Sequence, residues 1–194
     1  MEEKEGENGV AAMAAFYQGF DPATYLQNNY SPQQADLERK DSLDPWTLAC
    51  LHRAFTEGDV SGELLVDIGS GSTLYQVMSG CEVFNKVLLT DFLEVNRQEL
   101  RSWLQDEGGC RLDWTPFLQH VCKLEGRPPS AWTEIRCGYA RSSWTLSTLT
   151  HRQPSGPDVL PQQADCLMSS YSFEGASPDK HIQVFRMAKS QSQT

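Results

Sequence analysis

The feature that most constrains the fold is a short apolar run that ends in a glycine turn. Leu64-Leu65-Val66 is followed directly by Asp67-Ile68-Gly69-Ser70-Gly71. Glycine has no Cβ and tolerates a positive φ, so a strand can turn sharply there and present bare backbone N–H groups. Such a turn is typical of the carboxyl end of a strand in a parallel sheet, where a ligand can approach the backbone closely.

A second apolar run, Val87-Leu88-Leu89-Thr90, ends in Asp91, which follows Gly71 by twenty residues. A carboxylate at the end of a second strand can accept hydrogen bonds from both hydroxyls of a ribose. Leu74 stands where a dinucleotide-binding turn has its third glycine, so this turn suits a nucleoside without phosphates, such as S-adenosylmethionine. On the glycines alone, a tight turn without a ligand is an equal alternative.

The segments around the turn alternate between strand and helix patterns. Helices are expected from Pro45, with Asp44 as N-cap, over residues 74–79, and over 92–104, where apolar residues recur at helical spacing. Residues 164–170 are a further strand candidate. Residues 105–160 show little periodicity and are expected to form an irregular insertion. The alternation predicts the beginning of a doubly wound α/β domain.

Aromatic residues are dense before the first predicted strand. Five rings and two asparagines fall within fifteen residues: Phe16, Tyr17, Phe20, Tyr25, Asn28, Asn29 and Tyr30. One interpretation is a helix that packs its rings on the domain core. The other is a lid that closes over a bound ligand and excludes water.

Composition narrows the class of partner. The net charge is −10, and no stripe of Lys or Arg is present to neutralise phosphates, which argues against a nucleic-acid partner and favours a small, cationic molecule. No apolar stretch reaches the ~18 residues of a membrane span, and the acidic amino terminus is unlike a secretory signal, so a cytosolic location is expected. The six cysteines are scattered without a Cys-x-x-Cys pair, which favours buried thiols over disulfides or zinc.

From Phe16 to Asp179 the chain resembles the small-molecule N-methyltransferases, the class I methyltransferase group that includes the phenylethanolamine, nicotinamide and indolethylamine enzymes. The resemblance rests on three strings: Tyr25-Leu26-Gln27-Asn28-Asn29-Tyr30, the glycine turn with Tyr75-Gln76, and Thr90-Asp91-Phe92-Leu93-Glu94-Val95-Asn96-Arg97-Gln98-Glu99-Leu100. The third string is more similar to the phenylethanolamine branch than to the other two. The resemblance implies a Rossmann-like doubly wound sheet and methyl transfer from S-adenosylmethionine to the primary amine of a phenylethanolamine, without a metal.

The resemblance also implies roles for individual residues. The positions that would hold the cofactor are Tyr25, Tyr30, Gly69, Ser70, Tyr75, Asp91, Asn96 and Ser170. Asn29, Tyr171 and Glu174 would line the pocket for the aromatic amine, and Glu174 is the expected catalytic proton acceptor, directly or through water. Without the resemblance, Tyr171 would be interpreted as a core residue and Glu174 as a solvated loop charge.

Two regions depart from the family pattern. Where relatives have a carboxylate that reads the adenine amino group, this chain has residues 144–151 without an acid. The similarity is expected to end after Asp179, which predicts a partial methyltransferase domain at 10–179 and a divergent tail at 180–194. Residues 1–9 are charged and are expected to be disordered. A sheet that stops after residues 165–170 would leave an uncovered edge strand. The chain is then expected to be a monomer, or to aggregate through that edge, and to have little activity. Alternatives are a non-catalytic form that binds the cofactor or a full-length partner, and a methyltransferase for another small amine.

Overall fold

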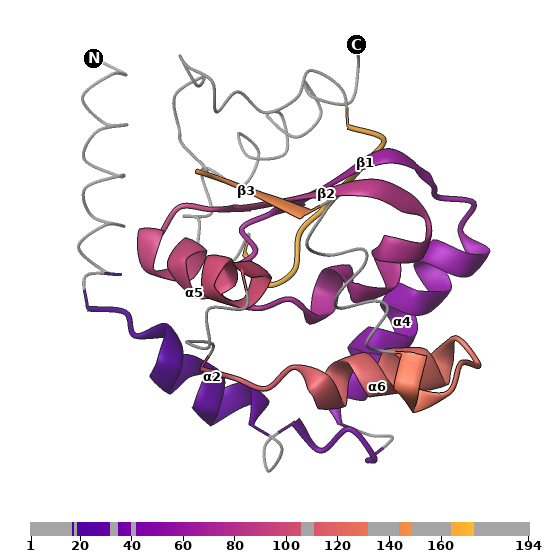
Figure 1. Ribbon diagram of the computed structural model, residues 1–194, viewed down its shortest axis with the longest axis horizontal. Helices are drawn as coiled ribbons and strands as arrows, with labels where there is room; N and C mark the ends of the chain where they lie inside the picture. Colours follow the sequence, from indigo (N-terminus) through magenta and orange to yellow (C-terminus); the bar gives the residue numbers. More distant parts are fainter. Residues whose placement is uncertain are drawn as a thin grey trace.

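The computed structural model describes residue 17 and residues 19–31, 35–39, 42–105, 111–131, 144–148 and 164–172. Its centre is a sheet of four parallel strands, β1 (Gly62–Ile68), β2 (Phe84–Asp91), β3 (Trp144–Thr148) and β4 (Cys166–Met168), in the order β3-β2-β1-β4. This arrangement confirms the predicted Rossmann-like α/β fold (Figure 1).

The register of the sheet brings the two predicted motifs to one edge. β1 pairs with β2 from Gly62↔Phe84 to Ile68↔Thr90, so both strands end at the same level. Most residues of their apolar runs are buried, as the inner strands of a parallel sheet require. The strand order reverses between β1 and β4, and in such sheets ligands bind at the carboxyl ends of the strands beside this reversal.

The described helices lie on one side of the sheet in Figure 1. They are α2 (Pro22–Tyr30), α4 (Leu43–Glu57), the 3₁₀ helix η1 (Tyr75–Glu82), α5 (Glu94–Gln105), α6 (Thr115–Leu124) and the short η2 (Pro129–Ala131). η1 connects β1 to β2 and α5 lies between β2 and β3, and right-handed crossovers that proceed in one direction along a sheet place both on the same face.

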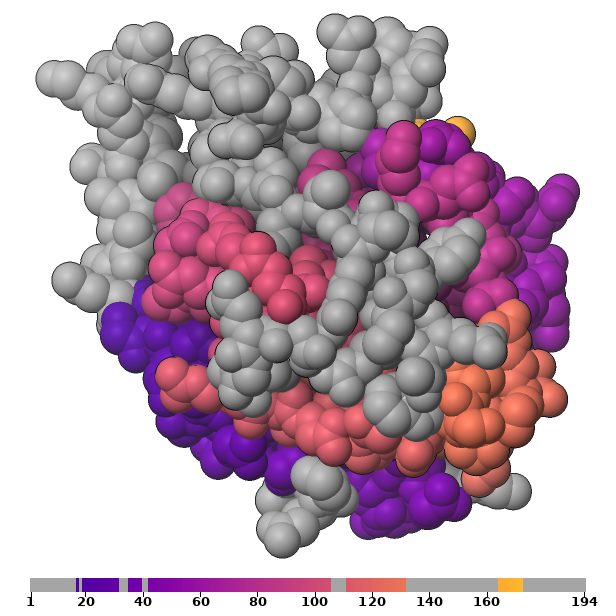
Figure 2. All heavy atoms as spheres, in the orientation of Figure 1, coloured from indigo at the N-terminus to yellow at the C-terminus, as the bar shows by residue number. Residues whose placement is uncertain are grey.

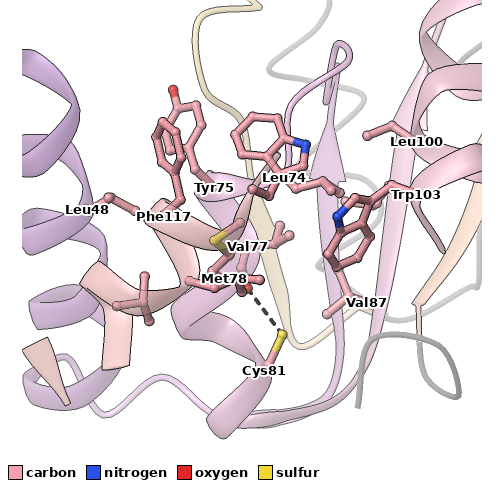
Figure 3. Close-up of a cluster of buried hydrophobic side chains, with 14 of the residues drawn as sticks. Leu48, Leu74, Tyr75, Val77, Met78, Cys81, Val87, Leu100, Trp103 and Phe117 are labelled. Atoms are coloured by element: carbon pink, nitrogen blue, oxygen red, sulfur yellow. Dashed lines mark hydrogen bonds between the residues drawn. The ribbon is translucent and has the colours of Figure 1, made fainter. Parts of the chain in front are cut away.

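The core lies between this helical layer and the sheet (Figure 3). Tyr75 of η1 and Phe117 of α6 lie side by side with ring centroids 6.2 Å apart, and Leu48 of α4 lies next to them. Trp103 of α5 lies over Val87 of β2. All five side chains are buried, so helices that are far apart in sequence are held on the sheet by one continuous apolar cluster.

Three expectations about local structure were wrong. Asp44 does not cap α4: the helix begins after Ser42 without a side-chain cap, and Asp44 lies in its first turn. The helix expected at 74–79 is a 3₁₀ helix that continues to Glu82. The region expected to be irregular contains α6 and β3; the helical spacing of Phe117, Leu118 and Val121, all buried, is the signal that was overlooked.

The amino-terminal segment packs beside α6 and the loop before it. Figure 2 shows the two regions next to each other on this face. The side-chain amide of Gln27 donates to the Arg111 carbonyl at 2.9 Å, and Lys123 pairs with Glu38 at 3.4 Å. These contacts attach the aromatic segment to the domain rather than leaving it as a separate arm.

Several expectations fall outside the described residues: the segments 1–9 and 180–194, Glu174, Cys110 and Cys137. Of the described cysteines, Cys81 and Cys122 are buried, Cys166 is half-buried and Cys50 is exposed, and none of these four forms a disulfide with another described residue. Among the helices that the structure describes, none combines the length and the apolar character needed to cross a lipid bilayer.

Candidate functional site

The glycine turn after β1 has the predicted backbone conformation. Gly69 and Gly71 have φ angles of +71° and +63°, in the left-handed region that favours glycine. A Cβ built at Gly69 would lie 2.5 Å from the Cβ of Ser172, whereas a Cβ built at Gly71 would meet no atom within 4 Å. One glycine therefore permits close packing inside the protein, and the other borders open space.

Asp91 lies at the end of β2 and holds the neighbouring backbone in place. One carboxylate oxygen, Oδ2, accepts from the N–H of Gly71 at 2.8 Å. The other, Oδ1, accepts from the N–H of Leu93 at 2.8 Å and from the side-chain amide of Asn96 at 3.0 Å. The structure therefore brings together Asp91 and Asn96, which the sequence assigned to one site, and joins them to the glycine turn at Gly71.

The peptide that carries the turn is tied to β2. Ser70 donates its N–H to the Thr90 carbonyl at 2.7 Å, and its hydroxyl accepts from the N–H of Thr90 at 3.2 Å. The Thr90 hydroxyl donates to the carbonyl of Asp67 at 2.8 Å. Ser70 is buried, so its predicted contribution to ligand binding comes through the backbone that it fixes.

A second turn, after β4, lies against the first. The hydroxyls of Ser169 and Ser172 lie 2.9 and 3.0 Å from the carbonyl oxygen of Ile68 and within hydrogen-bond distance of each other, so their two hydrogens are shared among these three contacts. Between them Tyr171 has a φ of +54° and is 57% exposed. A bulky residue in this conformation is strained, and such residues are concentrated at functional sites. The interpretation of Tyr171 as a core residue is wrong, and Ser170 is half-buried in the same turn.

Aromatic rings continue from α2 into the core. Tyr30 lies 5.5 Å from Tyr75, 6.0 Å from Trp114 and 6.2 Å from Phe117 between ring centroids, and Tyr25 lies 5.9 Å from Tyr30. Burial raises the pKa of the Tyr30 and Tyr75 hydroxyls well above their usual range, so both stay protonated. Tyr30 belongs to the core, as the packing interpretation expected, while Tyr25 is half-buried.

Asn29 is exposed at the end of α2, where its amide donates to the Tyr25 carbonyl at 2.7 Å. The sequence analysis assigned no role to several residues that hold the backbone of the glycine turn and of Asp91 in place. Gln76 and Asp67 are almost fully buried and bonded to each other at 2.9 Å, and Arg97 donates to the Asp91 carbonyl at 2.6 Å. A polar residue within the apolar pattern of η1 was the available signal for Gln76.

The donors and acceptors around Asp91 fit a nucleoside. Asn96 Oδ1 and the Ser72 hydroxyl are buried without a hydrogen-bond partner among the described residues. Buried polar atoms without partners are rare, and those beside a ligand site are commonly satisfied by the ligand. The open space at Gly71 and these two unsatisfied polar atoms are compatible with a polar ligand such as a nucleoside.

A parallel sheet in the order β3-β2-β1-β4, with a glycine turn after β1 and a carboxylate after β2, is the arrangement of a Rossmann-like α/β domain. Residues 7–191 match the NNMT/PNMT/TEMT family, and the chain belongs to this family; the match extends beyond Asp179, where the similarity was expected to end. It is 47% identical over 178 residues to phenylethanolamine N-methyltransferase of Bos taurus, covering 90% of this chain and 62% of the relative.

Two further relatives set the range of similarity. The identity to phenylethanolamine N-methyltransferase of Rattus norvegicus is 43% over 188 residues, which covers 96% of this chain and 65% of the relative. The identity to indolethylamine N-methyltransferase of Mus musculus is 36% over 171 residues, covering 87% of this chain and 62% of the relative. The chain thus spans less than two thirds of the length of these relatives.

Proposed function

We propose that this chain binds S-adenosylmethionine and belongs to an N-methyltransferase that acts on the primary amine of a phenylethanolamine. The observation that carries the proposal is the carboxylate of Asp91, which accepts a hydrogen bond from the glycine turn at 2.8 Å and lies at a strand end of the kind where Rossmann-like folds hold a ribose. The higher identity to phenylethanolamine N-methyltransferases, 43–47% against 36–37% for indolethylamine N-methyltransferases, favours the phenylethanolamine substrate.

The described residues have separate tasks in this proposal. Asp91 and Asn96 accept the ribose hydroxyls, Gly69 and Ser70 keep the turn in shape, and the space beside Gly71 admits the ligand. Tyr25, Tyr30 and Tyr75 shield the bound molecule from water, and Ser170 contributes from the turn after β4. When bound, S-adenosylmethionine supplies an electrophilic methyl group on a sulfonium.

The amine must lose a proton before it can act as a nucleophile. A phenylethanolamine is mostly protonated at neutral pH, so the site needs a proton acceptor and a surface that orients the nitrogen. Glu174 is the proposed acceptor, directly or through water, and Asn29 and Tyr171 are proposed to line the amine pocket. The side chains of Asn29 and Tyr171 are exposed in the structure and accessible to a substrate.

A second candidate substrate is an indolethylamine, favoured by the 36% identity to indolethylamine N-methyltransferase of Mus musculus. Both candidates are aromatic ethylamines, so they differ in the ring that the pocket must accept rather than in the chemistry of methyl transfer. A side-by-side assay of the two amine classes separates them.

Calorimetric titration of the purified chain with S-adenosylhomocysteine, with circular dichroism on the same sample, tests the cofactor part. We expect saturable binding by the folded chain, weakened at least tenfold by Asp91→Asn, because a charged hydrogen bond contributes ~1.5–3 kcal/mol. Asp59→Asn is the matched control, since Asp59 is exposed and outside the site. A folded chain that does not bind would refute the proposal; turnover of an indolethylamine but not of a phenylethanolamine would refute its substrate part.

A further inference from the structure

Gln76 is the most highly connected polar side chain beneath the glycine turn. It is 1% exposed, and its amide nitrogen lies within hydrogen-bond distance of three acceptors: Asp67 Oδ2 at 2.9 Å, the Thr73 carbonyl at 3.0 Å and the Ser70 carbonyl at 3.2 Å. Its amide oxygen accepts from the Thr73 hydroxyl at 3.0 Å. Since an amide nitrogen has two hydrogens, one is shared between two acceptors, and the side chain has a single possible orientation.

Asp67 fixes that orientation. It is fully buried at the end of β1, and Oδ1 has no hydrogen-bond partner among the described residues, so the bond from Gln76 to Oδ2 is its main stabilising contact. An isolated carboxylate is costly to bury, and the negative charge selects the nitrogen side of the Gln76 amide over its oxygen side. Burial raises the pKa of Asp67 to about 6, although the bond from Gln76 opposes this rise.

The connection reaches Asp91 through one peptide group. Gln76 binds the Ser70 carbonyl, and a planar trans peptide points the following N–H, that of Gly71, in the opposite direction. That N–H donates to Asp91 Oδ2 at 2.8 Å. The orientation of Gln76 is therefore transmitted to the carboxylate that is proposed to hold the ribose.

We propose that Asp67 and Gln76 form a buried positioning pair that orients the Ser70–Gly71 peptide, and through it Asp91, for cofactor binding. This inference rests on the proposed function, because the ligand is the same cofactor. Neither side chain contacts the ligand in this proposal; both act through the backbone of the turn.

The first test is Gln76→Glu, which replaces the donor nitrogen by an oxygen facing three acceptors. We expect the dissociation constant for S-adenosylhomocysteine to rise at least tenfold. The swap of Asp67→Asn with Gln76→Glu restores one donor between the two side chains but none for the two turn carbonyls, so it should recover folding and not affinity. Gln119→Glu, the same change at an exposed position of α6, should bind as the parent chain does.

The second test is the dependence of affinity on pH, which a merely structural role would not produce. Protonated Asp67 is a weaker acceptor, so affinity should fall severalfold as the pH falls through about 6, and Asp67→Asn should remove this dependence. Two other acids lie nearby: Asp91 from β2, which raises the pKa of Asp67, and Asp44 from α4, which raises the pKa of Tyr75 and whose own pKa is about 6. Asp44→Asn should retain the dependence.

The outcomes separate this inference from the proposed function. A folded parent chain that does not bind S-adenosylhomocysteine at any pH rejects both. A parent chain that binds with the same affinity at all pH values, or a Gln76→Glu variant that binds as tightly as the parent, overturns the positioning pair alone. If Gln76→Glu does not fold, the pH profiles of the parent chain and Asp67→Asn decide the question.

Discussion

Ser172 occupies the space that a side chain at Gly69 would need: a Cβ at Gly69 would lie 2.5 Å from the Cβ of Ser172 and 2.8 Å from its hydroxyl. The two residues belong to the turns after β4 and β1, on either side of the point where the strand order reverses. The hydroxyl of Ser172 also donates to the carbonyl of Ile68. The absent side chain at Gly69 is therefore what allows the two turns to meet.

Gly69→Ala should consequently be more damaging than Gly71→Ala. Both substitutions place a Cβ at a positive φ, which costs ~1–2 kcal/mol. Only Gly69→Ala also forces apart the turns after β1 and β4, so its total loss of stability should be about 3 kcal/mol. Chemical denaturation of both variants measures the difference, and Ser172→Gly should partly rescue Gly69→Ala. Equal losses of stability in the two variants would show that the contact with Ser172 is unimportant.

Gly71→Ala should instead affect ligand binding. Its Cβ would project into open space, so the folded domain tolerates it at the cost of backbone strain alone. If the cofactor occupies that space, the dissociation constant for S-adenosylhomocysteine should rise more than tenfold in a variant that remains folded. A folded Gly71→Ala variant with unchanged affinity would place the ligand elsewhere.

The parts of the site that could be predicted from the sequence are those fixed by local backbone chemistry. The apolar runs before Gly69 and Asp91 predicted two parallel strands, and parallel strands end at a common edge, so the meeting of Gly71 with Asp91 followed. The contacts of Gln76 could not be predicted, because they depend on how η1 folds back under the turn. The helical spacing of the apolar residues in α6 could have predicted that helix, but the neighbouring Gly, Pro and Trp residues favoured an irregular segment.

Asp44 illustrates a local rule that tertiary packing overrides. An acid before Pro45 predicts a helix cap, yet the helix begins earlier, and Asp44 lies in its first turn without a hydrogen bond or ion pair to any described residue. Burial raises its pKa to about 6, above the ~3.9 of an unfolded chain. The charged form is therefore disfavoured by folding.

Because folding raises the pKa of Asp44, the stability contribution of this residue depends on pH. The contribution of Asp44 is favourable when it is protonated and is lost as the pH rises through about 6. Asp44→Asn should thus be more stable than the parent chain at pH 7, by about 1 kcal/mol after allowance for solvent screening, and equally stable below about pH 4. Urea denaturation at several pH values measures the difference. A less stable variant at pH 7 would mean that attraction to the helix dipole outweighs burial.

Tyr30 and Tyr25 test whether α2 is a core element, a cover, or both. Tyr30 is 8% exposed and contacts four other rings, so Tyr30→Ala should lower the free energy of unfolding by ~3–5 kcal/mol. Tyr25 is half-buried between Phe20 and Tyr30, and Tyr25→Ala should cost less than half as much while weakening S-adenosylhomocysteine binding. Denaturation and calorimetry on both variants separate the two properties. If Tyr30→Ala left stability unchanged, α2 would be a lid that is not part of the core; if Tyr25→Ala left affinity unchanged, the helix would have a packing role only.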